Sequence, residues 1–149
     1  MSDNILKLIP FSPTYMPDDY SIEKALTHLQ QHVQSADNIN VVKSNLPRFI
    51  DQGANFEKII CPNCTSLIDV NWWQEAMDKA YKNGFEDLTI KTSCCGMETS
   101  LNELKYYWPA GFARLSIEIR NPRTEIPDDV LEKVEEILHS HIRKIWAHY

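Results

Sequence analysis

Glycine is scarce in this 149-residue chain, and long apolar runs are missing altogether. With four glycines and eight prolines, the composition differs from that of a collagen or a flexible linker. No apolar run approaches the roughly 20 residues that a transmembrane helix needs, and residues 1–4 lack the basic start of a secretory signal. We therefore expect a cytoplasmic protein that neither spans nor binds a membrane.

Basic side chains are outnumbered by acidic ones, which gives a formal net charge of −6. Proteins bind a phosphate backbone largely through Lys and Arg, so this charge disfavours a nucleic-acid partner and makes a nucleic-acid accessory protein the weakest alternative. An acidic surface suits another protein as partner, in particular a basic one. The chain also has no Gly-x-Ser-x-Gly elbow and no glycine-rich phosphate loop, so these motifs do not indicate an enzyme.

The rest of the composition is that of a globular protein, with 43% hydrophobic and 10% aromatic residues. A chain of this length buries one ordinary core, so we expect a single domain over residues 1–149. Apolar residues recur at helical spacing over 21–34, with Ser21 as N-cap, and over 70–82, with Asp69 as N-cap. A third helix is predicted from Pro127 almost to Tyr149, because an apolar stripe continues to the end of the chain.

Several segments have the short apolar runs that are typical of strands. Residues 113–120 alternate between apolar and polar side chains, as a half-buried antiparallel strand does. Shorter strands are predicted at 5–9, 39–42, 56–60 and 88–91, and Pro47 indicates irregular chain after the second of these. This order of elements predicts an α+β fold in which helices pack on one face of a mainly antiparallel sheet.

The four cysteines carry the most specific chemical signal in the sequence. Cys61 and Cys64 follow one predicted strand, and Cys94 and Cys95 follow another. Zn²⁺ takes four such thiolates in a tetrahedron, and two strand ends lying side by side would supply them. We therefore predict a bound Zn²⁺ held by all four cysteines within residues 61–96.

The sequence Cys61-Pro62-Asn63-Cys64 resembles the metal-binding knuckle of zinc-ribbon and rubredoxin-like sites, where Cys-Pro-x-Cys is the usual form. The resemblance covers only the residues around the two cysteine clusters, and it implies a ribbon-like four-cysteine site built into a larger domain. A regular second knuckle would have a cysteine at Thr92, three residues before Cys95. The connection between the clusters, residues 65–93, is also longer than in common ribbons.

Adjacent ligands at positions 94 and 95 raise a geometric difficulty, because successive strand side chains point to opposite faces. The turn into Gly96 would relieve it. The alternative is that only Cys95 binds the metal, with a histidine or water completing the shell and Cys94 buried as a small apolar side chain.

Two further interpretations of the cysteines remain, besides ordinary free thiols. One is a thiol–disulfide oxidoreductase that uses Cys61 and Cys64, although these cysteines precede a loop and not a helix N-terminus, where thiols are activated. The other is a metalloenzyme whose zinc has an open position. Four thiolates leave no such position, so we favour a structural zinc in a protein that is not an enzyme.

The expected function is therefore binding to another protein, as an acidic immunity protein binds a basic toxin. Aromatic residues dominate such interfaces. The candidate partner surface consists of five aromatic residues: Trp72, Trp73, Tyr106, Tyr107 and Trp108.

Overall fold

The computed structural model describes residues 2–149 and has three helices and eight strands in that part of the chain. In chain order they are β1 (Asn4–Pro10), α1 (Asp19–His32), β2 (Asn38–Ile50), β3 (Lys58–Ile60), α2 (Val70–Lys82), β4 (Thr89–Lys91), β5 (Glu98–Ser100), β6 (Lys105–Tyr107), β7 (Gly111–Arg120), α3 (Asp128–Leu138) and β8 (Ile142–His148). None of these helices is both long enough and apolar enough to cross a membrane.

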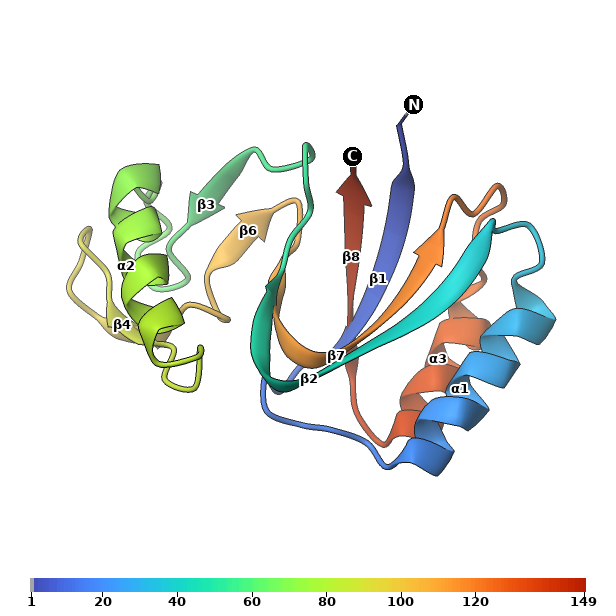
Figure 1. Cartoon of the computed structure of the whole chain (residues 1–149). Coiled ribbons are helices and arrows are strands. Elements are labelled where there is room, and N and C mark those ends of the chain that lie inside the picture. Colours follow the sequence, from blue (N-terminus) through green and yellow to red (C-terminus); the bar gives the residue numbers. More distant parts are fainter. Residues whose placement is uncertain (1) are drawn as a thin grey trace.

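Four strands form the main sheet in the order β2-β7-β1-β8, and all neighbours are antiparallel. The units β1-α1-β2 and β7-α3-β8 are interleaved, because each unit places one strand between the two strands of the other. This order is the split βαβ, or ferredoxin-like, arrangement. Helices α1 and α3 lie side by side on one face of the sheet (Figure 1). The predicted α+β fold with a mainly antiparallel sheet is confirmed.

The core between the sheet and these two helices is built on the alternating residues of β7. Leu115, Ile117 and Ile119 are all fully buried. The side chains that pack with them come from β1, α1 and α3 and include Leu6, Leu8, Ala25, Leu29, Val134 and Leu138. Burying an aliphatic side chain of this size stabilises a fold by about 1.5–3 kcal/mol, so these residues of β7 contribute strongly to the stability of the sheet.

The prediction of a helix reaching almost to Tyr149 is wrong. Helix α3 ends at Leu138, His139 takes a left-handed conformation with φ 55°, and the chain then forms β8 alongside β1. In β8 Ile145 is buried and its neighbour Trp146 is exposed. The apolar residues of this segment fit both a helical and an alternating pattern, and pairing with the far end of the chain selects the strand.

Two smaller predictions also need correction. The N-cap of α1 is Asp18 and not Ser21, since the Asp18 carboxylate accepts a hydrogen bond from the Ser21 backbone N–H (2.7 Å). Strand β2 continues past Pro47, where irregular chain was expected, with a register shift between Lys43 and Arg48. Proline has no backbone N–H to donate to a neighbouring strand. Pro47 is tolerated because β2 is an edge strand and because Pro47 lies at this irregularity in the pairing with β7.

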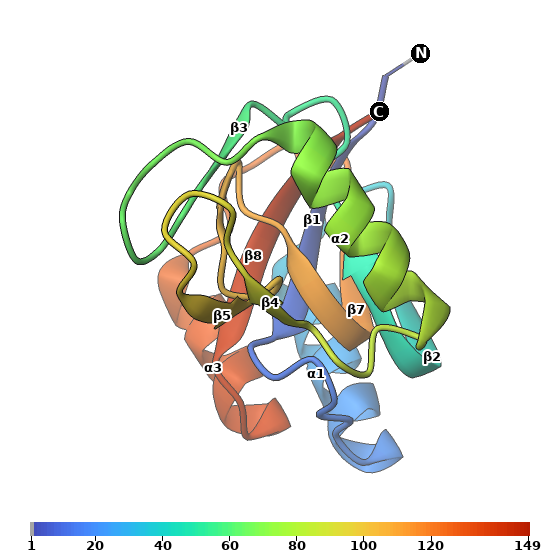
Figure 2. The same ribbon diagram turned by 90° about the vertical axis from the view of Figure 1, so that its left-hand side faces the viewer.

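A second lobe, residues 51–110, is inserted between β2 and β7. It contains α2 and two short antiparallel pairs, β3 with β6 (Figure 1) and β4 with β5 (Figure 2). Aromatic rings join this lobe to the main sheet: the ring of Phe85 in the lobe lies 5.2 Å from that of Phe112 in β7, and the ring of Trp73 in α2 lies 5.7 Å from that of Phe49 in β2. The insertion thus shares a core with the sheet, and it carries all four cysteines.

Candidate metal centre

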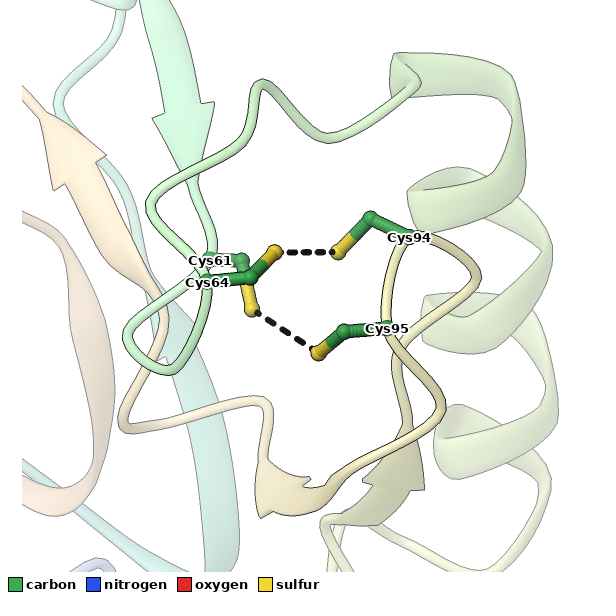
Figure 3. Close-up of side chains that lie close together, drawn as sticks. All are labelled: Cys61, Cys64, Cys94 and Cys95. Carbon is green, nitrogen blue, oxygen red and sulfur yellow. Dashed lines mark hydrogen bonds between the residues drawn. The ribbon is translucent and has the colours of Figure 1, made fainter.

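The four cysteines come together between two loops of the second lobe (Figure 3). Cys61 and Cys64 lie in the loop after β3, and Cys94 and Cys95 lie in the loop between β4 and β5. Their Sγ atoms all lie within 4.8 Å of one another, and the pairs Cys61–Cys95 and Cys64–Cys94 are separated by 3.9 Å and 3.3 Å. Sulfurs at 2.3 Å from a tetrahedral Zn²⁺ would be about 3.8 Å apart. The cluster therefore has the dimensions of a four-thiolate metal site.

The first loop folds into a tight knuckle. The Thr65 N–H donates to the Cys61 carbonyl (3.0 Å), and the Cys61 N–H donates to the Ser66 carbonyl (2.9 Å). Thr65 takes a positive φ of 61°, which turns the chain back toward β3. As a result, Cys61 and Cys64 present their thiols on the same side of the turn.

The second loop has the same backbone pattern. The Gly96 N–H donates to the Thr92 carbonyl (2.8 Å), and the Thr92 N–H donates to the Met97 carbonyl (3.2 Å). Gly96 has a φ of 70°, close to that of Thr65. Thr92 therefore matches Cys61, and Cys95 matches Cys64. The second knuckle is regular in its backbone although a threonine stands where a cysteine was expected.

The surroundings of the thiols favour a thiolate at Cys61. Burial raises the pKa of Cys61, but the backbone N–H groups of Cys64 and Asn63, together with the side chains of Cys94 and Thr92, lower it to about 6. The Ser66 hydroxyl and N–H also lower the pKa of Cys64. These N–H donors come from the knuckle itself, so the turn that gathers the sulfurs also stabilises their negative charge.

Cys94 differs from Cys61 and Cys64 in its electrostatics. Desolvation raises its pKa to about 11, and the neighbouring sulfurs of Cys64 and Cys61 act in the same direction. Thiolates that share one site repel one another, and a divalent cation would compensate their charge and release the remaining protons.

The difficulty with adjacent ligands at 94 and 95 is resolved by the loop. Both residues lie in the turn between β4 and β5 and not in a strand, so the alternation of strand side chains does not apply to them. Cys94 is exposed, which contradicts the alternative in which it is a buried apolar side chain. Helix α2 begins only at Val70, after residues 65–69, so Cys61 and Cys64 do not lie at a helix N-terminus.

The five aromatic residues of the candidate partner surface do not share one environment. Tyr106 is buried, donates its hydroxyl to the Leu101 carbonyl (2.7 Å) and accepts from the Trp73 indole N–H (3.1 Å), so its assignment to the surface is wrong. Trp72 and Trp73 are half-buried. Tyr107 and Trp108 are 44% and 45% exposed and remain available to a partner.

Thr92 is the residue of the site that sequence reasoning did not assign. It is 2% exposed, and its hydroxyl oxygen lies 3.2 Å from Cys95 Sγ and 3.8 Å from Cys61 Sγ. The signal for its place was its spacing, three residues before Cys95. A threonine cannot be recognised from composition as part of a thiolate site, since its hydroxyl is a poor ligand for Zn²⁺.

Comparisons of this chain with protein-family models, with curated proteins and with solved structures found no match.

Proposed function

We propose that this chain is a zinc protein in which Cys61, Cys64, Cys94 and Cys95 hold one structural Zn²⁺, and that it acts by binding another protein. The observation that carries the metal assignment is the gathering of four Sγ atoms within 4.8 Å. Zinc is favoured because four thiolates in a tetrahedron are typical of structural zinc sites, although such a set also suits iron.

A closed shell supports a structural role. With four thiolates bound, no coordination position is left for a water or a substrate, and a catalytic zinc needs one. The metal would instead connect the β3 loop to the β4–β5 loop, so that Cys64 and Cys94, 30 residues apart in the chain, share one ion. Cross-linking of this kind adds the free energy of metal binding to the stability of the lobe.

Metal analysis of the purified protein tests this assignment. We expect about one zinc per chain by inductively coupled plasma mass spectrometry, and four reactive thiols after denaturation with a chelator. The variant Cys64→Ser should lose most of its zinc, whereas Ser93→Ala, a change on an exposed neighbour of the cluster, should keep it. Iron in place of zinc would overturn the metal identity, and a protein without metal would overturn the site.

The proposed partner surface is centred on Tyr107 and Trp108. These two residues are adjacent in the chain and are 44% and 45% exposed, so together they offer a partner an apolar contact area. The net charge of −6 favours a basic partner, as in the pairing of an acidic immunity protein with a basic toxin.

A binding comparison between one tryptophan variant and one tyrosine variant tests this surface. Trp108→Ala should weaken capture of a basic partner from lysate without lowering the zinc content, because large aromatic residues dominate interface energies. Tyr20→Ala is the control, since Tyr20 is 76% exposed but lies on α1, away from the second lobe. Loss of folding in the Trp108 variant would place this residue in the core and defeat the proposal.

A further inference from the structure

The two knuckles match residue for residue, but their ligands do not. In the first knuckle the first and fourth residues, Cys61 and Cys64, carry the thiols. In the second, the corresponding residues are Thr92 and Cys95, as the shared backbone hydrogen bonds show. Cys94 corresponds to Asn63, the third residue of the first knuckle. The fourth thiol of the cluster thus comes from outside the regular ligand positions.

The side chain of Thr92 occupies the position in the second knuckle that corresponds to the ligand Cys61 in the first. Its side chain is buried, and its hydroxyl lies between the sulfurs of Cys61 and Cys95, at 3.8 Å and 3.2 Å. Cys94 is exposed, and its Sγ lies 3.3 Å from that of Cys64. Cys95 is exposed as well, whereas Cys61 is buried and Cys64 is half-buried.

We infer that Cys94 is a modification site, at which a peroxide oxidises the proposed zinc centre, and that Cys64 then forms a disulfide with it. This inference rests on the proposed zinc site. Metal binding keeps Cys94 as a thiolate, and the thiolate is the reactive form of cysteine. Cys94 and Cys95 both have exposed side chains, but only Cys94 lies outside the knuckle register, and its Sγ is 3.3 Å from that of Cys64.

The chemistry balances with peroxide as the only added reactant. The Cys94 thiolate attacks one peroxide oxygen, the O–O bond breaks, and hydroxide leaves while Cys94 becomes a sulfenic acid. The Cys64 thiolate then attacks the Cys94 sulfur, which forms the S–S bond and releases a second hydroxide. The two sulfurs are oxidised, the peroxide oxygens are reduced, and Zn²⁺ leaves without a change of oxidation state because two of its ligands are lost.

Peroxide treatment of the zinc-loaded protein tests this inference. A chromogenic zinc chelator follows metal release, and mass mapping of alkylated peptides identifies the disulfide formed. We expect release of zinc together with a Cys64–Cys94 disulfide. A first-formed disulfide that does not contain Cys94, such as Cys61–Cys64, would overturn the inference.

The double variant Thr92→Cys/Cys94→Ser provides the decisive comparison. It moves the fourth thiol into the regular buried position, so we expect it to retain zinc and to release it several-fold more slowly in peroxide than the wild type does. Ser93→Ala is the control and should react like the wild type, because it changes an exposed side chain and keeps both Thr92 and the exposed Cys94.

The outcomes separate the two proposals. If the double variant retains zinc but releases it as fast as the wild type, the assignment of Cys94 is wrong while the zinc site itself stands. If the wild-type protein holds no zinc, the proposed function fails and this inference fails with it. The disulfide map of the wild type decides the matter even where the double variant does not fold.

Discussion

Lys7 is a charged side chain that is buried in the main sheet, with only 6% of its surface exposed. Its ammonium group donates to the Asp51 carbonyl (3.0 Å) and the Tyr149 hydroxyl (2.7 Å), and it pairs with the Asp51 carboxylate at 3.2 Å. A buried charge is tolerated only when it is paired and hydrogen-bonded. The Lys7 ammonium group therefore holds together strand β1, the start of the inserted lobe and the last residue of the chain.

The Asp51 carboxylate should make stability depend on acid pH. Burial raises its pKa, but the charge of Lys7 and the hydrogen bonds from Tyr149, Lys7 and Gly53 outweigh this and hold it below its usual value. Because the pKa is lower in the folded state, the carboxylate stabilises the protein at neutral pH, and this contribution is lost as the pH falls below about 4 and the group is protonated.

We expect Asp51→Asn to lower the free energy of unfolding by about 1 kcal/mol at pH 7, a small value because the Asp51 side chain is 42% exposed. Urea unfolding of wild type and variant over a pH series would measure it, and the difference should shrink in acid. The control is Asp19→Asn, since Asp19 is 89% exposed and should contribute little. A difference that persists unchanged at low pH would show that the carboxylate charge is not the cause.

Asn102 links the two lobes through its amide. It is 3% exposed, its carbonyl oxygen accepts from the Phe112 N–H (2.9 Å), and its NH₂ group donates to the Phe11 carbonyl (3.1 Å). Replacing it by leucine would leave a buried N–H and a carbonyl without partners. We expect Asn102→Leu to cost about 2–3 kcal/mol in thermal unfolding, against almost nothing for the exposed Asn45→Ala.

At the scale of elements, β8 is the segment whose conformation most affects the fold. It pairs with β1 over its whole length, from Asn4↔His148 to Pro10↔Ile142. The final strand thereby completes the interleaved order of the sheet. If residues 142–148 were helical, β1 would lie at the edge of the sheet with one side of its backbone unpaired in the described structure.

Two adjacent alanine substitutions distinguish strand from helix in this segment. Ile145 is 0% exposed and Trp146 is 36% exposed. We expect Ile145→Ala to lower the free energy of unfolding by about 2–5 kcal/mol, as removal of a buried isoleucine side chain does. Trp146→Ala should cost clearly less, although tryptophan is the larger residue. Chemical denaturation measures both, and a greater loss for Trp146 would contradict the strand.

At the scale of the whole molecule, two cores of different origin lie next to each other. The core of the main sheet consists of aliphatic side chains from β1, β7, α1 and α3. The core of the inserted lobe is rich in aromatic residues and includes the buried Cys61. The proposed metal would therefore act on the second core directly and on the first only through their shared boundary at Phe49 and Phe112.

Removal of the metal should accordingly loosen one lobe more than the other. We expect a strong chelator to increase amide hydrogen exchange in residues 61–101 while the central strands β1 and β7 remain protected, because local stability follows local packing. Exchange measured by mass spectrometry with and without chelator would show this, with re-addition of Zn²⁺ as the control. Equal loss of protection in both lobes would mean that the metal supports the entire fold.

Features that depend on neighbours along the chain follow from the local sequence. The Asp69 N-cap of α2 forms as predicted, with its carboxylate accepting from the N–H groups of Asn71 and Trp72. The alternation of residues 113–120 marked the buried strand β7, and the two cysteine clusters marked a site. Capping, periodicity and knuckle spacing are local, so short stretches of sequence contain all the information that they need.

Features that depend on distant partners are set by tertiary contacts. Residues 142–148 fit a helix or a strand until β1 lies beside them, and Tyr106 looks like a surface aromatic until Trp73 and Leu101 enclose its hydroxyl. Cys94 joins the cluster because the β4–β5 loop closes with Thr92 in the regular ligand position. In each case the deciding feature is a contact between residues far apart in the chain or a particular turn geometry. Residue types alone specify neither.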